Sequence, residues 1–160
     1  ITFIDTAGAY PGIEGEERGQ SEAIATNLAV MSKLRTPIIV IITGEGGSGG
    51  ALAIGVGDHI AILEHATYSV ASPEACASII WRTAEKASDA AEAMKVSAQE
   101  LIKIKIVDEI IKEPLGGAHR DYKEISESVR SCILKNLGTL LSKPIDDLLE
   151  ARYKKLLEIG

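Results

Sequence analysis

The chain has 160 residues, enough for one domain with a buried core, and its 46% hydrophobic and 25% charged residues are ordinary for a globular protein. A net charge of −6 argues against a nucleic-acid partner, and no apolar run reaches the roughly 20 residues that a membrane-spanning helix needs. The two cysteines, Cys76 and Cys132, match no metal-binding spacing, so we expect a reducing compartment and no metal site in this chain.

Strands and helices are expected to alternate through most of the chain. The run 37–42 is continuously apolar and β-branched, which is typical of a strand buried on both faces. The chain opens on another strand-like run without an initiating Met, so we expect a fragment of a longer protein. The first elements expected are strand 1–4, loop 5–12, helix 14–34, strand 37–42, a glycine loop 43–50 and a helix from residue 51.

The later elements continue this alternation and then become helical. Ser72 followed by Pro73 predicts a capped helix start, and the residues from Ser97 to Glu100 match a capping box. The elements expected are strands 59–63 and 67–70, helices beginning at 72, 86 and 97, strand 107–111, loop 114–119, and helices 122–141 and 144–157. This order predicts an α/β fold with a largely parallel sheet.

The chemistry of the chain is expected to centre on the glycine-rich segment 43–52. A strand leads into the glycines, and a helix is expected to lead away from them. The first turn of a helix has unpaired backbone N–H groups and the positive end of the helix dipole. Because glycine has no Cβ atom, an anion or a developing oxyanion can approach such a backbone closely.

One interpretation of this segment is a dinucleotide-binding site. Gly44-x-Gly46-x-x-Gly49 matches the dinucleotide fingerprint, and Glu64 ends the next expected strand, where a ribose-binding acid would lie. This pattern predicts an NAD-binding oxidoreductase. Against it, a strand, a loop and a long helix precede the motif, whereas a typical fingerprint lies on the first strand of its unit.

A second interpretation is a serine hydrolase. Gly46-x-Ser48-x-Gly50 matches the nucleophile elbow, and Ser48, Asp108 and His119 follow the chain order of a hydrolase triad. A third is an oxyanion hole made of backbone N–H groups. Glycines that serve only close packing are a fourth explanation, and the pattern alone leaves all four open.

Segments 44–53, 68–77 and 113–119, together with Asp5-Thr6-x-Gly8-Ala9-Tyr10, resemble the carboxyltransferase alpha subunit of the multi-subunit acetyl-CoA carboxylase. The resemblance covers essentially the whole chain, which is similar to the C-terminal part of that longer subunit. It implies a crotonase-like (ClpP/crotonase) α/β fold of stacked β-β-α units with C-terminal helices. It also implies a single, N-terminally truncated carboxyltransferase domain over 1–160, with a helical extension over 120–160.

The resemblance further implies an enzyme that transfers a carboxyl group from carboxybiotin to acetyl-CoA, giving malonyl-CoA for fatty acid biosynthesis. The Gly49 and Gly50 amides would hold the biotin ureido oxygen, and Gly8 and Ala9 would offer a second oxyanion donor. Tyr10 would contact biotin. The substrate-binding residues implied in addition are Gly46 and Gly47.

The resemblance also implies partners and a compartment. Biotin would be carried on a separate biotin carboxyl carrier protein, and a zinc-ribbon beta subunit would hold the acetyl-CoA enolate in an α2β2 complex. The complex would lie in a bacterial cytoplasm or a plastid stroma, with no metal in this chain.

Overall fold

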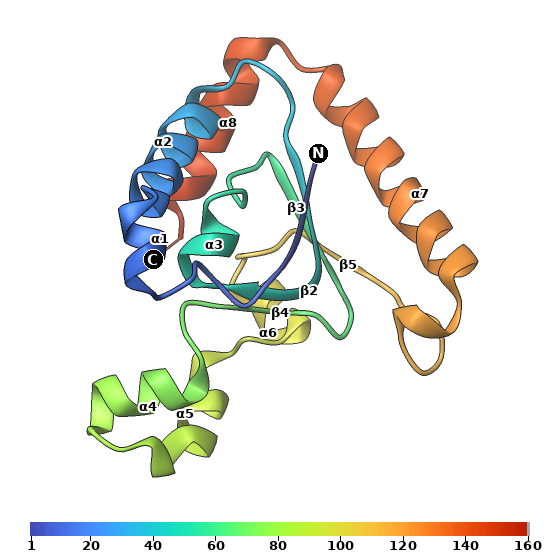
Figure 1. Ribbon diagram of the computed structural model, residues 1–160. Helices are drawn as coiled ribbons and strands as arrows, with labels where there is room; N and C mark the ends of the chain where they lie inside the picture. Colours follow the sequence, from blue (N-terminus) through green and yellow to red (C-terminus); the bar gives the residue numbers. More distant parts are fainter. Residues whose placement is uncertain (160) are drawn as a thin grey trace.

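The computed structural model describes residues 1–159, and its centre is a parallel sheet (Figure 1). The strands β1 (Thr2–Thr6), β2 (Ile39–Gly47), β3 (His59–Leu63) and β5 (Glu109–Ile111) lie in the order β1-β2-β3-β5. A further strand, β4 (Thr67–Ser69), pairs with the last residues of β2, and every one of these pairings is parallel. The predicted α/β fold with a parallel sheet is confirmed.

The first half of strand β2 is the most deeply buried part of the sheet. The side chains of its first four residues, 39–42, are at most 1% exposed, as expected for a strand covered on both faces. The strand begins two residues later than predicted and continues five residues further, to Gly47. The prediction of a glycine loop over 43–50 is therefore wrong for its first half, because residues 43–47 stay extended and pair with β1 and β4.

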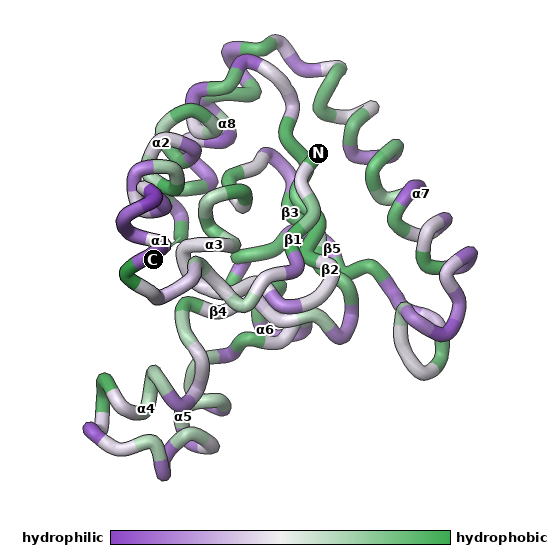
Figure 2. Tube along the Cα trace, in the orientation of Figure 1, coloured by the Kyte–Doolittle hydropathy of each residue, from purple (hydrophilic) through white to green (hydrophobic). Residues whose placement is uncertain are grey.

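Helices cover the two sides of the sheet, and Figure 2 shows that its strands form the apolar centre of the molecule. On one side lie α1 (Ile13–Glu17), α2 (Gln20–Lys33), α3 (Ser48–Leu52) and α8 (Ile145–Leu157), and on the other lies α7 (Tyr122–Leu141). The predicted helix 14–34 is in fact two helices, because Gly19 takes a left-handed conformation (φ +76°) that interrupts the helical backbone. The two predicted C-terminal helices are confirmed to within one residue.

The remaining helices follow β4. α4 (Pro73–Trp81), the 3₁₀ turn η1 (Ala84–Lys86) and α5 (Ala87–Met94) project from the body of the molecule (Figure 1), and α6 (Ala98–Lys103) and η2 (Ala118–Arg120) flank β5 in sequence. The Ser72 hydroxyl caps α4 by accepting a hydrogen bond from the Ala75 amide (3.1 Å), as predicted. The predicted capping box at Ser97 is wrong, since its side chain makes no capping bond. No helix within residues 1–159 is both long and apolar enough to cross a membrane.

A buried arginine fastens α8 to the rest of the fold. Arg152 is 1% exposed, and its guanidinium donates to both carboxylate oxygens of Asp58 at 2.8–2.9 Å. It also donates to the backbone carbonyls of Met31 and Leu34, at the end of α2, and of Thr36. All five N–H donors of the side chain are thereby satisfied, which is what a buried guanidinium requires.

Candidate active site

The glycines at the end of β2 are shaped by close packing. A Cβ atom on Gly47 would lie 2.1 Å from the Ala7 carbonyl oxygen, and one on Gly46 would lie 2.8 Å from the Tyr68 ring. Both glycines are buried. Neighbouring groups already occupy the space that a side chain on either residue would need. The explanation by close packing therefore holds for Gly46 and Gly47.

The backbone changes direction at Ser48, where β2 ends and α3 begins. Ser48 has a φ of +49°, a left-handed conformation that is unusual for a residue with a side chain. Gly49 and Gly50 follow as the second and third residues of α3, whose first amides have no acceptor inside the helix. Neither amide donates a hydrogen bond elsewhere in residues 1–159. Two adjacent N–H groups are thus available at the start of this short helix.

The loop after β1 lies directly against these amides. A Cβ atom on Gly50 would lie 2.6 Å from the Gly8 carbonyl carbon and 2.8 Å from the Ala9 nitrogen. The structure therefore brings together the Gly8–Ala9 peptide and the Gly49–Gly50 pair, which are separated by 40 residues in sequence. The Gly8 amide donates to the Thr6 hydroxyl (3.2 Å), whereas the Ala9 amide has no acceptor in the described part of the chain. Ala9 is thus the freer of the two predicted donors.

Tyr10 lies at the outer rim of the same loop. Its side chain is 63% exposed, and its ring covers Gly12, where a Cβ atom would lie 2.2 Å from Cε1. The side-chain Nε2 of Gln20 in α2 donates to the Tyr10 carbonyl at 2.5 Å and links the loop to that helix. The ring is thus exposed to a ligand or a partner and takes no part in the core.

An apolar cavity of about 440 Å³ opens beside the start of α3. Ser48 and Gly49 form one edge of it, and the Tyr68 ring forms another. Burial raises the pKa of Tyr68, so its hydroxyl stays protonated. Ser69 of β4 also lines the cavity. The remaining lining side chains are apolar and come from α3, the residue after β4, the end of α5, and the segment 96–106: Leu52, Val70, Met94, Val96, Leu101, Ile104 and Ile106. A cavity of this kind suits the apolar rings of a cofactor or acyl group.

The sequence did not point to this apolar lining. The residues come from four separate elements that are far apart along the chain. Their hydrophobic character is the same as that of ordinary core positions, so no pattern in the sequence distinguished them. Only the folding of 94–106 back towards α3 makes them a cavity wall.

The geometry disfavours the dinucleotide interpretation. The segment Gly44–Gly47 is extended strand, so it cannot form the tight phosphate-binding turn of the fingerprint. The Glu64 carboxylate is already engaged by the Lys112 ammonium (2.5 Å) and the Glu113 amide. The Lys112 hydrogen bond is the main reason that the pKa of Glu64 lies below its usual value.

The geometry also disfavours the hydrolase interpretation. The strained φ of Ser48 fits a nucleophile elbow, but Asp108 accepts hydrogen bonds from the Ile60 amide (2.7 Å) and the Lys155 ammonium. His119 borders a different cavity, between α7 and the sheet. The three residues do not assemble into a triad, so the backbone oxyanion hole is the interpretation that the geometry favours.

We expect Gly50→Ala to disturb this site through its backbone contact. The added methyl group would lie within 3.0 Å of the Gly8–Ala9 peptide, so the loop must shift, at a cost of about 1–3 kcal/mol in unfolding free energy. Gly49→Ala is the matched control, because its Cβ would meet only the Ile24 Cδ1 atom at 3.6 Å. Urea unfolding of both variants measures the difference, and equal stability would contradict the close contact.

Comparisons with known proteins show which sequences and structures this chain is similar to. A family model described as "Acetyl co-enzyme A carboxylase carboxyltransferase-like" matches residues 1–160. A curated relative from Vibrio cholerae, named acetyl-coenzyme A carboxylase carboxyl transferase subunit alpha, is 59% identical over the whole chain. The relative of the same name from Azotobacter vinelandii is 60% identical. The chain spans about half the length of these relatives, 50% and 51% respectively.

Solved structures share the fold at low sequence identity. The chain aligns with a Pseudomonas malonate decarboxylase hetero-tetramer in complex with coenzyme A at a TM-score of 0.74 and 20% identity, covering 94% of this chain and 59% of that one. Transcarboxylase 12S aligns at a TM-score of 0.62 and 22% identity, covering 69% of this chain and 23% of that one. These likenesses confirm the predicted crotonase-like fold.

Proposed function

Since this chain belongs to the acetyl-CoA carboxylase carboxyltransferase family, we propose that it forms the biotin-binding half of a carboxyltransferase active site. The reaction is transfer of a carboxyl group from carboxybiotin to acetyl-CoA, giving malonyl-CoA for fatty acid biosynthesis. The observation that supports this proposal is the pair of adjacent amides of Gly49 and Gly50, which have no acceptor within residues 1–159, with Gly49 at the edge of an apolar cavity.

The backbone of α3 supplies electrostatic stabilisation. When bound, carboxybiotin supplies the activated carboxyl group, and negative charge builds on its ureido oxygen as that group leaves. The Gly49 and Gly50 amides donate hydrogen bonds to this oxygen, and the apolar walls exclude water and strengthen those bonds. The adjacent Ala9 amide is the candidate second donor of this chain, with Gly8 holding its loop in place through Thr6.

The other predicted site residues take supporting positions in this proposal. Tyr10, at the exposed rim, packs against the biotin ring or its carrier. Gly46 and Gly47 allow β2 to run close to Tyr68 and Ala7, which sets the position of α3. The proposal assigns no side chain within residues 1–159 as nucleophile or base, since the biotin anion would be the group that takes up the substrate proton.

The proposal requires partners. The biotin is carried by a biotin carboxyl carrier protein, and a zinc-ribbon beta subunit holds the acetyl-CoA enolate, so that the active site spans an interface in an α2β2 complex. Residues 1–160 form a single carboxyltransferase domain in which the segment 120–160 is a C-terminal helical extension. The complex operates in a bacterial cytoplasm or a plastid stroma.

We expect this chain alone to be inactive, with activity appearing when the beta subunit is added. The physical reason is that the two developing charges are held by different subunits. The measurement is biotin-dependent decarboxylation of malonyl-CoA, with the chain, the beta subunit and their mixture assayed separately. Full activity of the isolated chain, or an inactive mixture in which the two proteins are shown to associate, would contradict the shared active site.

A further inference from the structure

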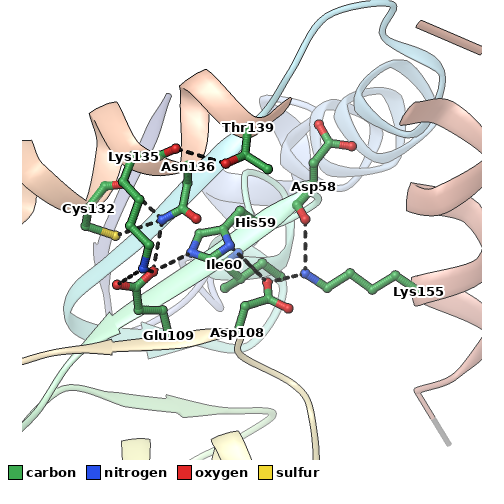
Figure 3. A network of polar contacts seen from close by, with 10 residues as sticks. All are labelled: Asp58, His59, Ile60, Asp108, Glu109, Cys132, Lys135, Asn136, Thr139 and Lys155. Carbon is green, nitrogen blue, oxygen red and sulfur yellow. Dashed lines mark hydrogen bonds and ion pairs between the residues drawn. The ribbon is translucent and has the colours of Figure 1, made fainter. Parts of the chain in front are cut away.

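Three side chains with metal-ligating atoms meet where β3, β5 and α7 come together (Figure 3). His59 begins β3, Glu109 begins β5, and Cys132 lies in the middle of α7. One ligand atom from each residue lies within 4.8 Å of the other two. Because the strands are parallel, this cluster lies at the end of the sheet opposite to Gly47 and the site described above.

The imidazole of His59 is partly buried, with a side chain that is 15% exposed, and one of its nitrogens lacks a hydrogen bond. Its Nε2 atom is inaccessible to solvent and makes no hydrogen bond to any group in residues 1–159, although Glu109 Oε2 lies only 3.3 Å away. Its other nitrogen, Nδ1, faces a carboxylate oxygen of Asp108 at 4.0 Å. Lys155 and the Ile60 amide hold that carboxylate in place.

We propose that His59 Nε2, Glu109 and Cys132 Sγ bind a divalent transition-metal ion of the zinc class. Imidazole nitrogen, carboxylate oxygen and thiolate sulfur are the ligands that zinc takes in proteins. Ligand atoms around a tetrahedral zinc ion are separated by about 3.3–3.6 Å, given the usual bond lengths. The 3.3 Å between Nε2 and Oε2 already has this value, and the Cys132 sulfur lies within 4.8 Å of the imidazole and of the carboxylate.

A carboxylate lies on the outer side of the His59 ring. Asp108 Oδ2 is 4.0 Å from Nδ1, which is longer than a hydrogen bond, so this carboxylate would have to move closer to orient a ligating imidazole. Three protein ligands leave a fourth coordination position for water. Figure 3 shows the His59 ring between the carboxylates of Glu109 and Asp108.

The charges balance once the metal is bound. The Cys132 thiol loses its proton to solvent, the sulfur bonds to the ion, and the thiolate and the Glu109 carboxylate together neutralise its two positive charges. Without metal, Glu109 instead accepts hydrogen bonds from the Asn136 side-chain Nδ2 (2.9 Å) and the Lys135 ammonium (3.3 Å). The same Asn136 Nδ2 also donates to Cys132 Sγ (3.5 Å), so the Asn136 side chain would turn away when the ion binds. Lys135 is therefore a competing cation, and its side chain is 69% exposed.

The metal would join α7 to two strands of the sheet. The ligands come from three elements, so binding is possible only when these elements are packed as they are here. An ion that binds the folded chain alone raises its melting temperature. The role inferred is structural, and the ion takes no part in carboxyl transfer.

The test uses the 160-residue chain, stripped with a chelator and titrated with Co²⁺ and then Zn²⁺. We expect one equivalent of Co²⁺ to give the visible spectrum of a tetrahedral site with a thiolate-to-metal charge-transfer band, and Zn²⁺ to displace it. Cys132→Ser should remove the charge-transfer band, and His59→Gln should weaken binding at least about tenfold. Cys76→Ser, at the other cysteine, should change neither.

Two further measurements keep the test independent of how the ligand variants fold. Lys135→Met should bind the metal more tightly than the unmodified chain, because it removes the competing cation without touching a ligand. Zn²⁺ should also protect Cys132, but not Cys76, from a thiol reagent in the unmodified chain. Absence of the charge-transfer band, its persistence in Cys132→Ser, or equal labelling of Cys132 with and without Zn²⁺ would overturn the proposal.

Discussion

Replacement of Gly49 by proline is expected to lower the rate of carboxyl transfer by about 10²–10³-fold, the usual cost of losing one oxyanion donor. Proline lacks the backbone N–H group, and it suits the first turn of a helix, where that group has no helical acceptor. Its ring also disfavours the left-handed backbone of the preceding Ser48, so the stability and the assembly of the variant are measured together with its rate. Gly49 occupies such a position in α3. The measurement is the transfer rate of the complex with the beta subunit and the biotin carrier.

Gly49→Ala is the control that distinguishes the effect of removing the backbone N–H group from the effect of adding side-chain atoms at this position. Its Cβ would point to Ile24 of α2, which does not line the apolar cavity, so the N–H group stays accessible. We expect Gly49→Ala to keep the rate within about threefold, a difference of less than 1 kcal/mol in barrier height. Equal losses in the two variants, with unchanged stability and assembly, would mean that the Gly49 amide is not a donor in the reaction.

Arg152→Met is expected to lower the free energy of unfolding by about 3–5 kcal/mol, because it leaves the Asp58 carboxylate buried without its cation. The Asp58 side chain is 3% exposed and also accepts a hydrogen bond from the Ile38 amide (2.7 Å), so it cannot turn out to solvent without breaking that bond. Three backbone carbonyls lose their donors in the same substitution. Urea unfolding, followed by circular dichroism, measures the loss.

Arg35→Met is the matched control for this prediction. Arg35 also pairs with an aspartate, Asp146, at 2.9 Å, but the two side chains are 59% and 81% exposed. An exposed pair contributes less than about 1 kcal/mol, so Arg35→Met should unfold almost as the unmodified chain does. A similar loss in both variants would show that burial does not set the strength of the Arg152 contact.

The sequence predicted the fold wherever local patterns decide the structure. The β-branched run at residues 39–42 predicted a buried strand, and the regular apolar spacing of 122–141 predicted a helix of those bounds. The break at Gly19 and the absence of a side-chain cap at Ser97 were missed, since glycine is tolerated within helices and a capping motif needs the right approach geometry.

Long-range contacts account for what the sequence could not predict. Arg152 lies in an amphipathic helix among other charged residues, and nothing in that pattern distinguishes it from a solvent-exposed arginine. The same holds for His59, Glu109 and Cys132, whose spacing matches no metal motif and which are brought together only by the packing of α7 on the sheet. The contact of Gly50 with the Gly8–Ala9 peptide likewise depends on the parallel pairing of β1 with β2.

The most direct measurement of the Gly49 and Gly50 amides is nuclear magnetic resonance of the chain labelled with ¹⁵N-glycine and titrated with biotin methyl ester. Formation of the proposed hydrogen bonds should move the Gly49 and Gly50 amide proton signals downfield together. The signal of Gly138 in α7 should stay unchanged, because a Cβ atom placed on this glycine would meet no other group within 4 Å. Unshifted signals from both residues up to the solubility limit of the ester, or shifts confined to other glycines, would contradict the account.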